Sequence, residues 1–324
     1  MIKNIIIFGT GKASYIHFLK YQLLGYTNIF FVNSNFDNRY NLNNIFPSLS
    51  SLTKEKEFSN EDTLIDICTP KSIFIKVIEE CEELGFKNII VEKPFVVSND
   101  YFNNKSDLKI LMIKNYNYSL ITNYAKDYII KNKLKITDIY TNFSKNRIDD
   151  SFSNRGMLNK NDIPTVFEIE MPHQIYLANY LRKMKRKEYK IVKALDMRND
   201  NISLKNHGYG FISYKSKDIK VCHESDLTSN TLQKTISIIC NKNTIINISY
   251  CLYDRNIQMI NKGIVEIVSN NKKMTKEFVE DDNVLLCLKE YINIFNKNLY
   301  SKKYQQDILD FSNELTFYLN VIGS

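Results

Sequence analysis

The first 114 residues alternate short apolar runs with segments of helical spacing. These runs predict strands that end at residues 8, 32, 68, 91 and 114, and the first of them, residues 5–8, lacks polar alternation, which is typical of a parallel strand covered on both faces. Between them, residues 12–24 and 71–85 carry apolar side chains at helical spacing; in the first segment these are Ala13, Ile16, Leu19 and Leu23. The pattern predicts a β-α-β sheet whose strand ends face one crevice.

The second half of the chain has a different pattern, with strand-like segments that recur between helical ones. Such an order is typical of an α+β domain, so we expect two domains, residues 1–117 and 118–324. The expected strands are 136–142, 189–197, 209–214, 234–240, 244–251 and 263–268, and the expected helices are 119–131, 164–183, 281–297 and 304–320.

Composition excludes several classes of protein. The net charge is +8, but the lysines are spread out, and the one dense run, residues 183–187, would close a helix, so we expect no nucleic-acid partner. The six cysteines show no metal-ligand spacing, and Cys222 and His223 would point to opposite faces of a strand. No run approaches the roughly 18 apolar residues of a membrane span. We therefore expect a reduced, cytoplasmic protein without metal.

Glycine is scarce in this chain, which gives weight to the places where it occurs. Nine glycines is fewer than half of the average share of roughly 7%. Two of them fall in Gly9-Thr10-Gly11-Lys12-Ala13-Ser14, directly after the first apolar run. Gly9 would permit a tight turn and Gly11 the approach of a phosphate, while Ser14 is small enough for close helix packing. The helix that follows would offer its N-terminus to a pyrophosphate, so the motif predicts dinucleotide binding.

The end of the second strand bears on cofactor choice. Enzymes that prefer NAD usually place an acidic residue there to bind the ribose hydroxyls. This chain has Asn33 and Ser34, with Arg39 soon after. A neutral site beside a cation favours NADP over NAD; in the alternative interpretation, Asn33 binds the ribose hydroxyls of NAD.

A second motif, Glu92-Lys93-Pro94-Phe95, follows the fourth apolar run. It puts Lys93 at the carboxyl end of a strand, where open α/β sheets bind their ligands. A lysine there can act in proton transfer, although an ordinary surface lysine is the alternative.

Four segments together resemble the glucose–fructose oxidoreductase/inositol dehydrogenase (Gfo/Idh/MocA) family: residues 9–14, Cys68-Thr69-Pro70, residues 92–95 and Asn115-Tyr116-Asn117-Tyr118. The resemblance implies a Rossmann domain, then a domain with an open, mainly antiparallel sheet, and oxidation or reduction of sugars, nucleotide sugars or cyclitols with NAD(P). The cofactor-binding residues it implies are Gly9, Thr10, Gly11, Lys12, Ala13, Asn33, Ser34, Arg39, Cys68, Thr69, Pro70, Glu92, Lys93 and Asn115.

The resemblance also implies a substrate-site histidine at His173. The family commonly has an aspartate four residues earlier, where this chain has Ile169; Glu170 is the candidate replacement, although Pro172 would distort the helix between them. The expected catalytic residues are Lys93, His173 and Glu170. His17 and His207, the latter in an expected turn, are interpreted as structural. Tyr116 and Tyr118 would lie at the crevice or in the core.

These residues predict an NAD(P)-dependent oxidoreductase that transfers hydride to or from a hydroxyl or carbonyl carbon of a small polar substrate. An imine or thiazoline reductase of the same fold and a non-catalytic dinucleotide-sensing regulator are the alternatives. The resemblance further implies a homodimer or homotetramer assembled through the open sheet face, to which residues 209–214 and 234–251 would contribute.

Overall fold

The computed structural model describes residues 1–34, 40–103, 105, 107–152, 163–184, 187–199, 202–253 and 259–323. The chain divides into two compact units. Unit 1 comprises Met1–Asn115 and Val284–Asn313, and unit 2 comprises Tyr116–Asn283 and Glu314–Ser324. The domain division at 117 stays a prediction. In the part of the chain that the structure describes, no helix is long and apolar enough to cross a membrane.

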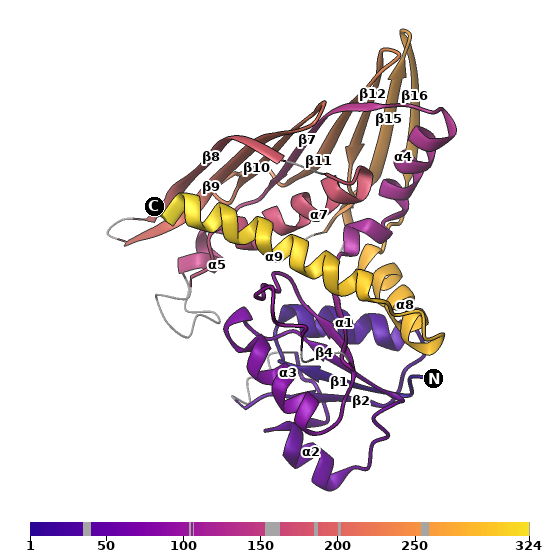
Figure 1. The fold of residues 1–324 in the computed structure, drawn as a ribbon, viewed down its shortest axis with the longest axis vertical. Coiled ribbons are helices and arrows are strands. Elements are labelled where there is room, and N and C mark those ends of the chain that lie inside the picture. Colours follow the sequence, from indigo (N-terminus) through magenta and orange to yellow (C-terminus); the bar gives the residue numbers. More distant parts are fainter. Residues whose placement is uncertain are drawn as a thin grey trace. The chain divides into compact units, whose positions relative to one another are not determined.

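Unit 1 is built on a six-stranded parallel sheet with the order β3-β2-β1-β4-β5-β6 (Figure 1). The side chains of β4 and β5 are buried throughout, as the continuous apolar runs predicted. Its elements are β1 (Asn4–Phe8), α1 (Lys12–Leu23), β2 (Ile29–Val32), β3 (Ile45–Phe46), α2 (Leu49–Glu55), β4 (Thr63–Ile67), η1 (Lys71–Ile73), α3 (Phe74–Glu83), β5 (Asn88–Val91), β6 (Lys109–Met112) and α8 (Asn283–Asn296), with η2 (Asn115–Tyr118) at its end.

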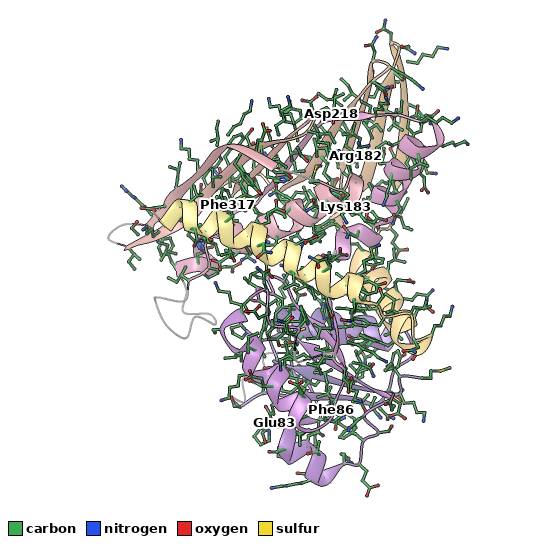
Figure 2. The ribbon with its side chains drawn as sticks, in the orientation of Figure 1. Glu83, Phe86, Arg182, Lys183, Asp218 and Phe317 are labelled. Carbon is green, nitrogen blue, oxygen red and sulfur yellow. The ribbon has the colours of Figure 1, made fainter. Side chains whose placement is uncertain are left out.

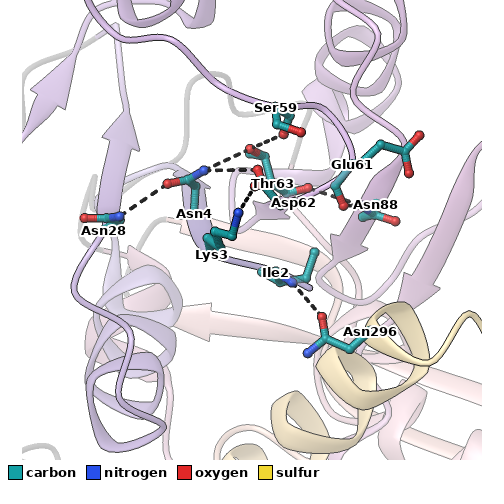
Figure 3. A network of polar contacts seen from close by, with 10 residues as sticks. All are labelled: Ile2, Lys3, Asn4, Asn28, Ser59, Glu61, Asp62, Thr63, Asn88 and Asn296. Carbon is teal, nitrogen blue, oxygen red and sulfur yellow. Dashed lines mark hydrogen bonds and ion pairs between the residues drawn. The ribbon is translucent and has the colours of Figure 1, made fainter.

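The amino ends of these strands are joined by polar contacts (Figure 3). The ammonium of Lys3 lies 2.9 Å from the Asp62 carboxylate, and the backbone N–H of Lys3 donates to the Asp62 carbonyl at 2.7 Å. Asn296 of α8 accepts the N–H of Ile2 at 2.6 Å. These bonds fix the start of β1 against the start of β4 and against α8, at the end of the sheet opposite to the predicted ligand edge.

The buried face of α1 differs from the prediction. The structure buries Ser14, His17 and Tyr21, whereas Leu23 is 68% exposed. The reason is a carboxylate in the core: Asp66, near the carboxyl end of β4, is 0% exposed and needs polar partners, which His17 and Tyr21 supply. Apolar spacing therefore identified the helix but not its buried face.

Unit 2 is built on an eight-stranded sheet with the order β16-β15-β12-β11-β7-β10-β9-β8. All neighbours are antiparallel except β7 and β10, so the predicted open, mainly antiparallel sheet is confirmed. Its elements are α4 (Leu120–Lys131), β7 (Ile136–Ser144), α5 (Ile148–Phe152), α6 (Val166–Ile169), α7 (Met171–Leu181), β8 (Lys187–Asn199), β9 (Ile202–Ser216), β10 (Ile219–Asp226), β11 (Gln233–Cys240), β12 (Thr244–Ser249), β13 (Leu252–Tyr253), β14 (Met259–Asn261), β15 (Gly263–Ser269), β16 (Lys272–Phe278) and the end of α9 (Lys302–Gly323).

Helices pack on this sheet and bury its inner face. α6 packs on β9, α7 on β7 and β10, and α4 on β12 and β15. The end of α9 adds an aromatic contact, since the ring of Phe317, labelled in Figure 2, stacks on Tyr189 of β8 with centroids 4.3 Å apart. α7 is the helix that carries His173, and nearly all of its residues are buried.

Two expectations about unit 2 are corrected. The helix expected over 164–183 is two helices, α6 and α7, which meet at Glu170; Pro172 lies in the first turn of α7, where a missing N–H breaks no helical hydrogen bond. His207 lies in strand β9 rather than in a turn, and its Nε2 lies 2.7 Å from the Ser151 hydroxyl. The sequence pattern also missed β16, whose side chains are almost all exposed and therefore show no alternation.

Candidate active site

The glycine turn after β1 contacts the ends of two neighbouring strands. Gly9 has φ +98°, a conformation that favours glycine, and a Cβ at this position would lie 3.1 Å from the carbonyl oxygen of Cys68. Its N–H donates to the Val32 carbonyl at 2.8 Å. The turn, the end of β2 and the end of β4 are thus held together, as the predicted crevice requires.

The N-terminus of α1 is open to a ligand. Gly11 is the N-cap residue, no side chain caps the helix, and the first turn has no acidic residue. A Cβ on Gly11 would meet no described atom within 4 Å, so packing does not require glycine there. Uncapped N–H groups, the positive end of the helix dipole and open space at Gly11 fit the pyrophosphate of a dinucleotide.

The other predicted cofactor residues lie around this turn. Asn33 donates to the Thr10 hydroxyl at 2.6 Å, and Ser34 beside it is exposed. Thr69, after β4, has a buried hydroxyl without a hydrogen-bond partner among the described residues, and Pro70 beside it is exposed. Lys12 is exposed, Ala13 is half-buried, and Asn115 is buried after β6. Arg39 lies outside the described residues.

A buried polar network lies beneath the turn and reaches the Lys93 backbone. Nδ1 of His17 lies 2.8 Å from Oδ2 of Asp66 and 3.3 Å from Sγ of Cys68, and its Nε2 lies 3.3 Å from Oε1 of Glu92. Oε2 of Glu92 then accepts the backbone N–H of Lys93 at 3.1 Å. The network therefore ties α1, β4 and the segment after β5 to one another.

The charges of this network support one another. Burial disfavours a charged ring, yet the Asp66 carboxylate and the hydrogen bonds with Asp66 and Cys68 outweigh it and raise the pKa of His17 well above its usual range. Burial likewise opposes the Glu92 carboxylate, but His17 and Lys93 lower its pKa. Burial and Asp66 raise the pKa of the Cys68 thiol to about 12. His17, Asp66 and Cys68 are close enough to ligate a metal, but a protonated thiol and mutual hydrogen bonds indicate a satisfied core network.

Lys93 stands at the carboxyl end of β5, as predicted. Its side chain is half-buried, and its peptide bond to Pro94 is cis. Lys93 belongs to unit 1, whereas Glu170 and His173 belong to unit 2. A relay between Lys93 and His173 accordingly stays a prediction.

In unit 2, Glu170 is the centre of a charged cluster. Its carboxylate is 4% exposed, forms an ion pair with Lys145 and lies 4.0 Å from the Lys234 ammonium. Burial disfavours the carboxylate, but Lys145 and Lys234 outweigh this and hold the pKa of Glu170 well below its usual range. Lys234 also donates to the hydroxyl of Tyr116 at 2.7 Å.

His173 lies beside this cluster in an aromatic setting. Its ring is edge-on to Tyr116 at a centroid distance of 5.1 Å, and its Nδ1 lies 2.9 Å from the hydroxyl of Tyr176. The Tyr176 oxygen accepts the backbone N–H of Tyr116 at 3.3 Å. It can therefore give its own proton to Nδ1, which leaves the proton of a neutral His173 on Nε2.

The sequence interpretation missed Lys145, Arg147 and Lys234. Lys145 and Arg147 follow β7, and their backbone N–H groups donate to the carbonyls of Asp226, the last residue of β10, and of Leu227. Their place at a strand end was the available signal, but no motif marks them.

Comparison with known proteins gives the fold. No protein-family model and no curated protein matches the chain. Solved structures do. A dehydrogenase (MviM) from Clostridium difficile has a TM-score of 0.69 and 15% identity, with 98% of this chain and 99% of that chain covered. The UDP-N-acetylglucosamine 3-dehydrogenase GnnA from Acidithiobacillus ferrooxidans has a TM-score of 0.70 and 12% identity, covering 98% of each chain.

A third structure is KijD10, a 3-ketoreductase from Actinomadura kijaniata, in complex with NADP and TDP-benzene. It has a TM-score of 0.76 and 8% identity, with 98% of this chain and 96% of that chain covered. The chain shares the fold of these three proteins over nearly its whole length, so the predicted architecture, a parallel sheet followed by an open, mainly antiparallel sheet, is confirmed.

Proposed function

We propose that this protein is an NAD(P)-dependent oxidoreductase that acts on a hydroxyl or carbonyl carbon of a small polar substrate of the sugar, nucleotide-sugar or cyclitol type. The observation that carries the proposal is the uncapped N-terminus of α1, with open space at Gly11. Lys93 at the end of β5 on the same sheet adds a group that can handle the substrate proton. The fold shared with NADP-bound KijD10 supports it.

The nicotinamide would supply the hydride, and the protein would supply position and proton transfer. Lys93 would hydrogen-bond the substrate oxygen and stabilise the alkoxide that develops during reduction. His173, with a proton on Nε2, would donate to or accept from the same oxygen. Glu170 pairs with Lys145 and lies near Lys234. It would stabilise the positive charge of these lysines rather than transfer a proton itself.

For the cofactor we favour NADP over NAD. Asn33 is neutral, and its side chain supports the glycine turn through Thr10. With Arg39 close in sequence, a neutral strand end would accept a 2′-phosphate better than an acidic one. Fluorescence titration with NADH and NADPH tests this; binding of NADH at least about tenfold tighter would overturn the preference.

Two other functions stay open as alternatives. An imine or thiazoline reductase would use the same turn and the same Lys93, and the absence of an aspartate at Ile169 favours a substrate without a sugar diol. A dinucleotide-sensing regulator would bind the cofactor without turnover; the presence of Lys93 argues against it.

The experiment that separates them is turnover by the wild type and by Lys93→Met with a panel of carbonyl and imine compounds. Lys93→Met should retain cofactor affinity and lose roughly a hundredfold or more in turnover. His173→Ala should lose less if Lys93 alone handles the proton, and about as much if the two act together. Lys76→Met, at an exposed position of α3, is the matched control. Near-normal turnover by Lys93→Met would remove Lys93 from the mechanism.

A further inference from the structure

The cluster around Glu170 has more positive than negative charge. Lys145 forms an ion pair with the Glu170 carboxylate, Lys234 lies 4.0 Å from it, and Arg147 acts on its charge through space, so three basic side chains act on one carboxylate. The Lys145 and Lys234 side chains are only 26% and 22% exposed. Partly buried charges are costly unless they are paired, so such an excess calls for an anionic partner.

Nearby carboxylates do not supply that partner. Glu168 accepts hydrogen bonds from the N–H and hydroxyl of Thr165, and Asp281 accepts the N–H of Leu120 at 2.8 Å and pairs with the Ser119 hydroxyl. Asp149 and Asp150 of α5 are exposed. Glu168 and Asp281 are thus engaged by hydrogen bonds of their own.

Arg147 is the member of the cluster with unused hydrogen-bonding capacity. Its Nε is buried and has no hydrogen-bond partner among the described residues. Its backbone is fixed, because its N–H donates to the Leu227 carbonyl at 2.8 Å. A guanidinium is suited to bind carboxylate or phosphate oxygens in pairs, and a buried donor without a partner is destabilising until a ligand fills it.

The electrostatics at Lys145 agree with an anion site. Burial lowers the pKa of Lys145 to about 7, with Arg147 and Lys234 acting in the same direction, although Glu170 opposes them. A bound anion would, like Glu170, counteract the effect of burial and raise the pKa of Lys145. Anion binding should therefore be linked to proton uptake by Lys145 near neutral pH.

We propose that Lys145, Arg147 and Lys234 bind an anionic group of the substrate, a carboxylate or a phosphate ester. This proposal rests on the proposed function and deepens it, because such a site would select acidic sugar-type substrates over neutral ones. Glu170 keeps the three cations in place and stops them from repelling one another in the free protein.

The test compares ligands that share a hexose and differ in charge. The full chain, loaded with NADP, is titrated calorimetrically with glucose, with glucuronate and with glucose 6-phosphate. We expect at least one of the two anions to bind about tenfold or more tightly than glucose, and which of them does so separates a carboxylate from a phosphate source. Arg147→Met and Lys234→Met should remove most of this preference, whereas Lys215→Met, an exposed lysine on β9, should retain it.

A second readout checks the site rather than the fold. Titrations near pH 7 in two buffers of different ionisation enthalpy should report proton uptake on anion binding by the wild type and little or none by Lys145→Met. Equal binding of glucose and both anions, or a preference that survives in Arg147→Met and Lys234→Met, would overturn the inference. Failure to bind either NADP or NAD would instead overturn the proposed function.

Discussion

Nε2 of His17 lies 3.3 Å from Oε1 of Glu92, while Nδ1 of the same ring lies 2.8 Å from Oδ2 of Asp66. One buried imidazole thus joins two carboxylates from different strand ends, and one of these accepts the N–H of Lys93. A helix face that packs against the sheet therefore also sets the backbone of the proposed catalytic lysine.

Replacing this imidazole should destabilise the protein. His17→Leu leaves Asp66 and Glu92 without their shared cation, and removing one partner of a buried ion pair typically costs about 3 kcal/mol or more. We expect a lower denaturation midpoint in urea and a lower turnover. Gln22→Ala, an exposed change on the same helix, should alter neither. A His17→Leu protein as stable as the wild type would mean that the network does not stabilise unit 1.

The same network predicts a pH dependence of stability. The pKa of His17 is raised on folding, so its contribution is complete below its unfolded pKa of about 6.5 and declines as pH rises toward the folded pKa. The pKa of Glu92 is lowered, so its contribution is complete above its unfolded pKa of about 4.3 and is lost as pH falls. The stability difference between wild type and His17→Leu should therefore be largest near pH 5.5 and shrink above pH 6.5. A difference that grows with rising pH would contradict the assigned charges.

The two motif glycines should respond differently to alanine. Gly9→Ala forces a side chain onto φ +98° with its Cβ 3.1 Å from a backbone oxygen, which should destabilise the protein by about 1–3 kcal/mol. Gly11→Ala meets no described atom, so stability should change by less than about 0.5 kcal/mol while dinucleotide affinity falls. Thermal unfolding and nicotinamide fluorescence titration measure both. An unchanged dinucleotide affinity in Gly11→Ala would mean that this turn does not bind the pyrophosphate of the cofactor.

The open sheet of unit 2 predicts self-association. Apolar side chains stand exposed on several of its strands, among them Ile191 at 50%, Leu195 at 48% and Met274 at 42%. We expect a dimer or tetramer in sedimentation velocity at micromolar concentration, and Ile191→Lys should shift it toward the monomer. A wild type that sediments strictly as a monomer would rule out this assembly.

The sequence was most informative where backbone geometry or continuous burial leaves few alternatives. The parallel sheet followed from apolar runs that match β1, β2, β4, β5 and β6, and Gly9 was recognised at a turn that only glycine adopts easily. Lys93 was placed at the end of β5 because a strand-end motif is a local property of the chain.

Only the tertiary structure decided how polar groups pair across the chain. The sequence by itself determined the fold class and the glycine turn, since periodicity and backbone conformation are set by neighbouring residues. The buried face of α1 was decided by Asp66, 49 residues from His17, and the surroundings of Glu170 by Lys145 and Lys234 on other elements. Charges are paired through space, and their spacing in sequence carries no record of which strand ends meet.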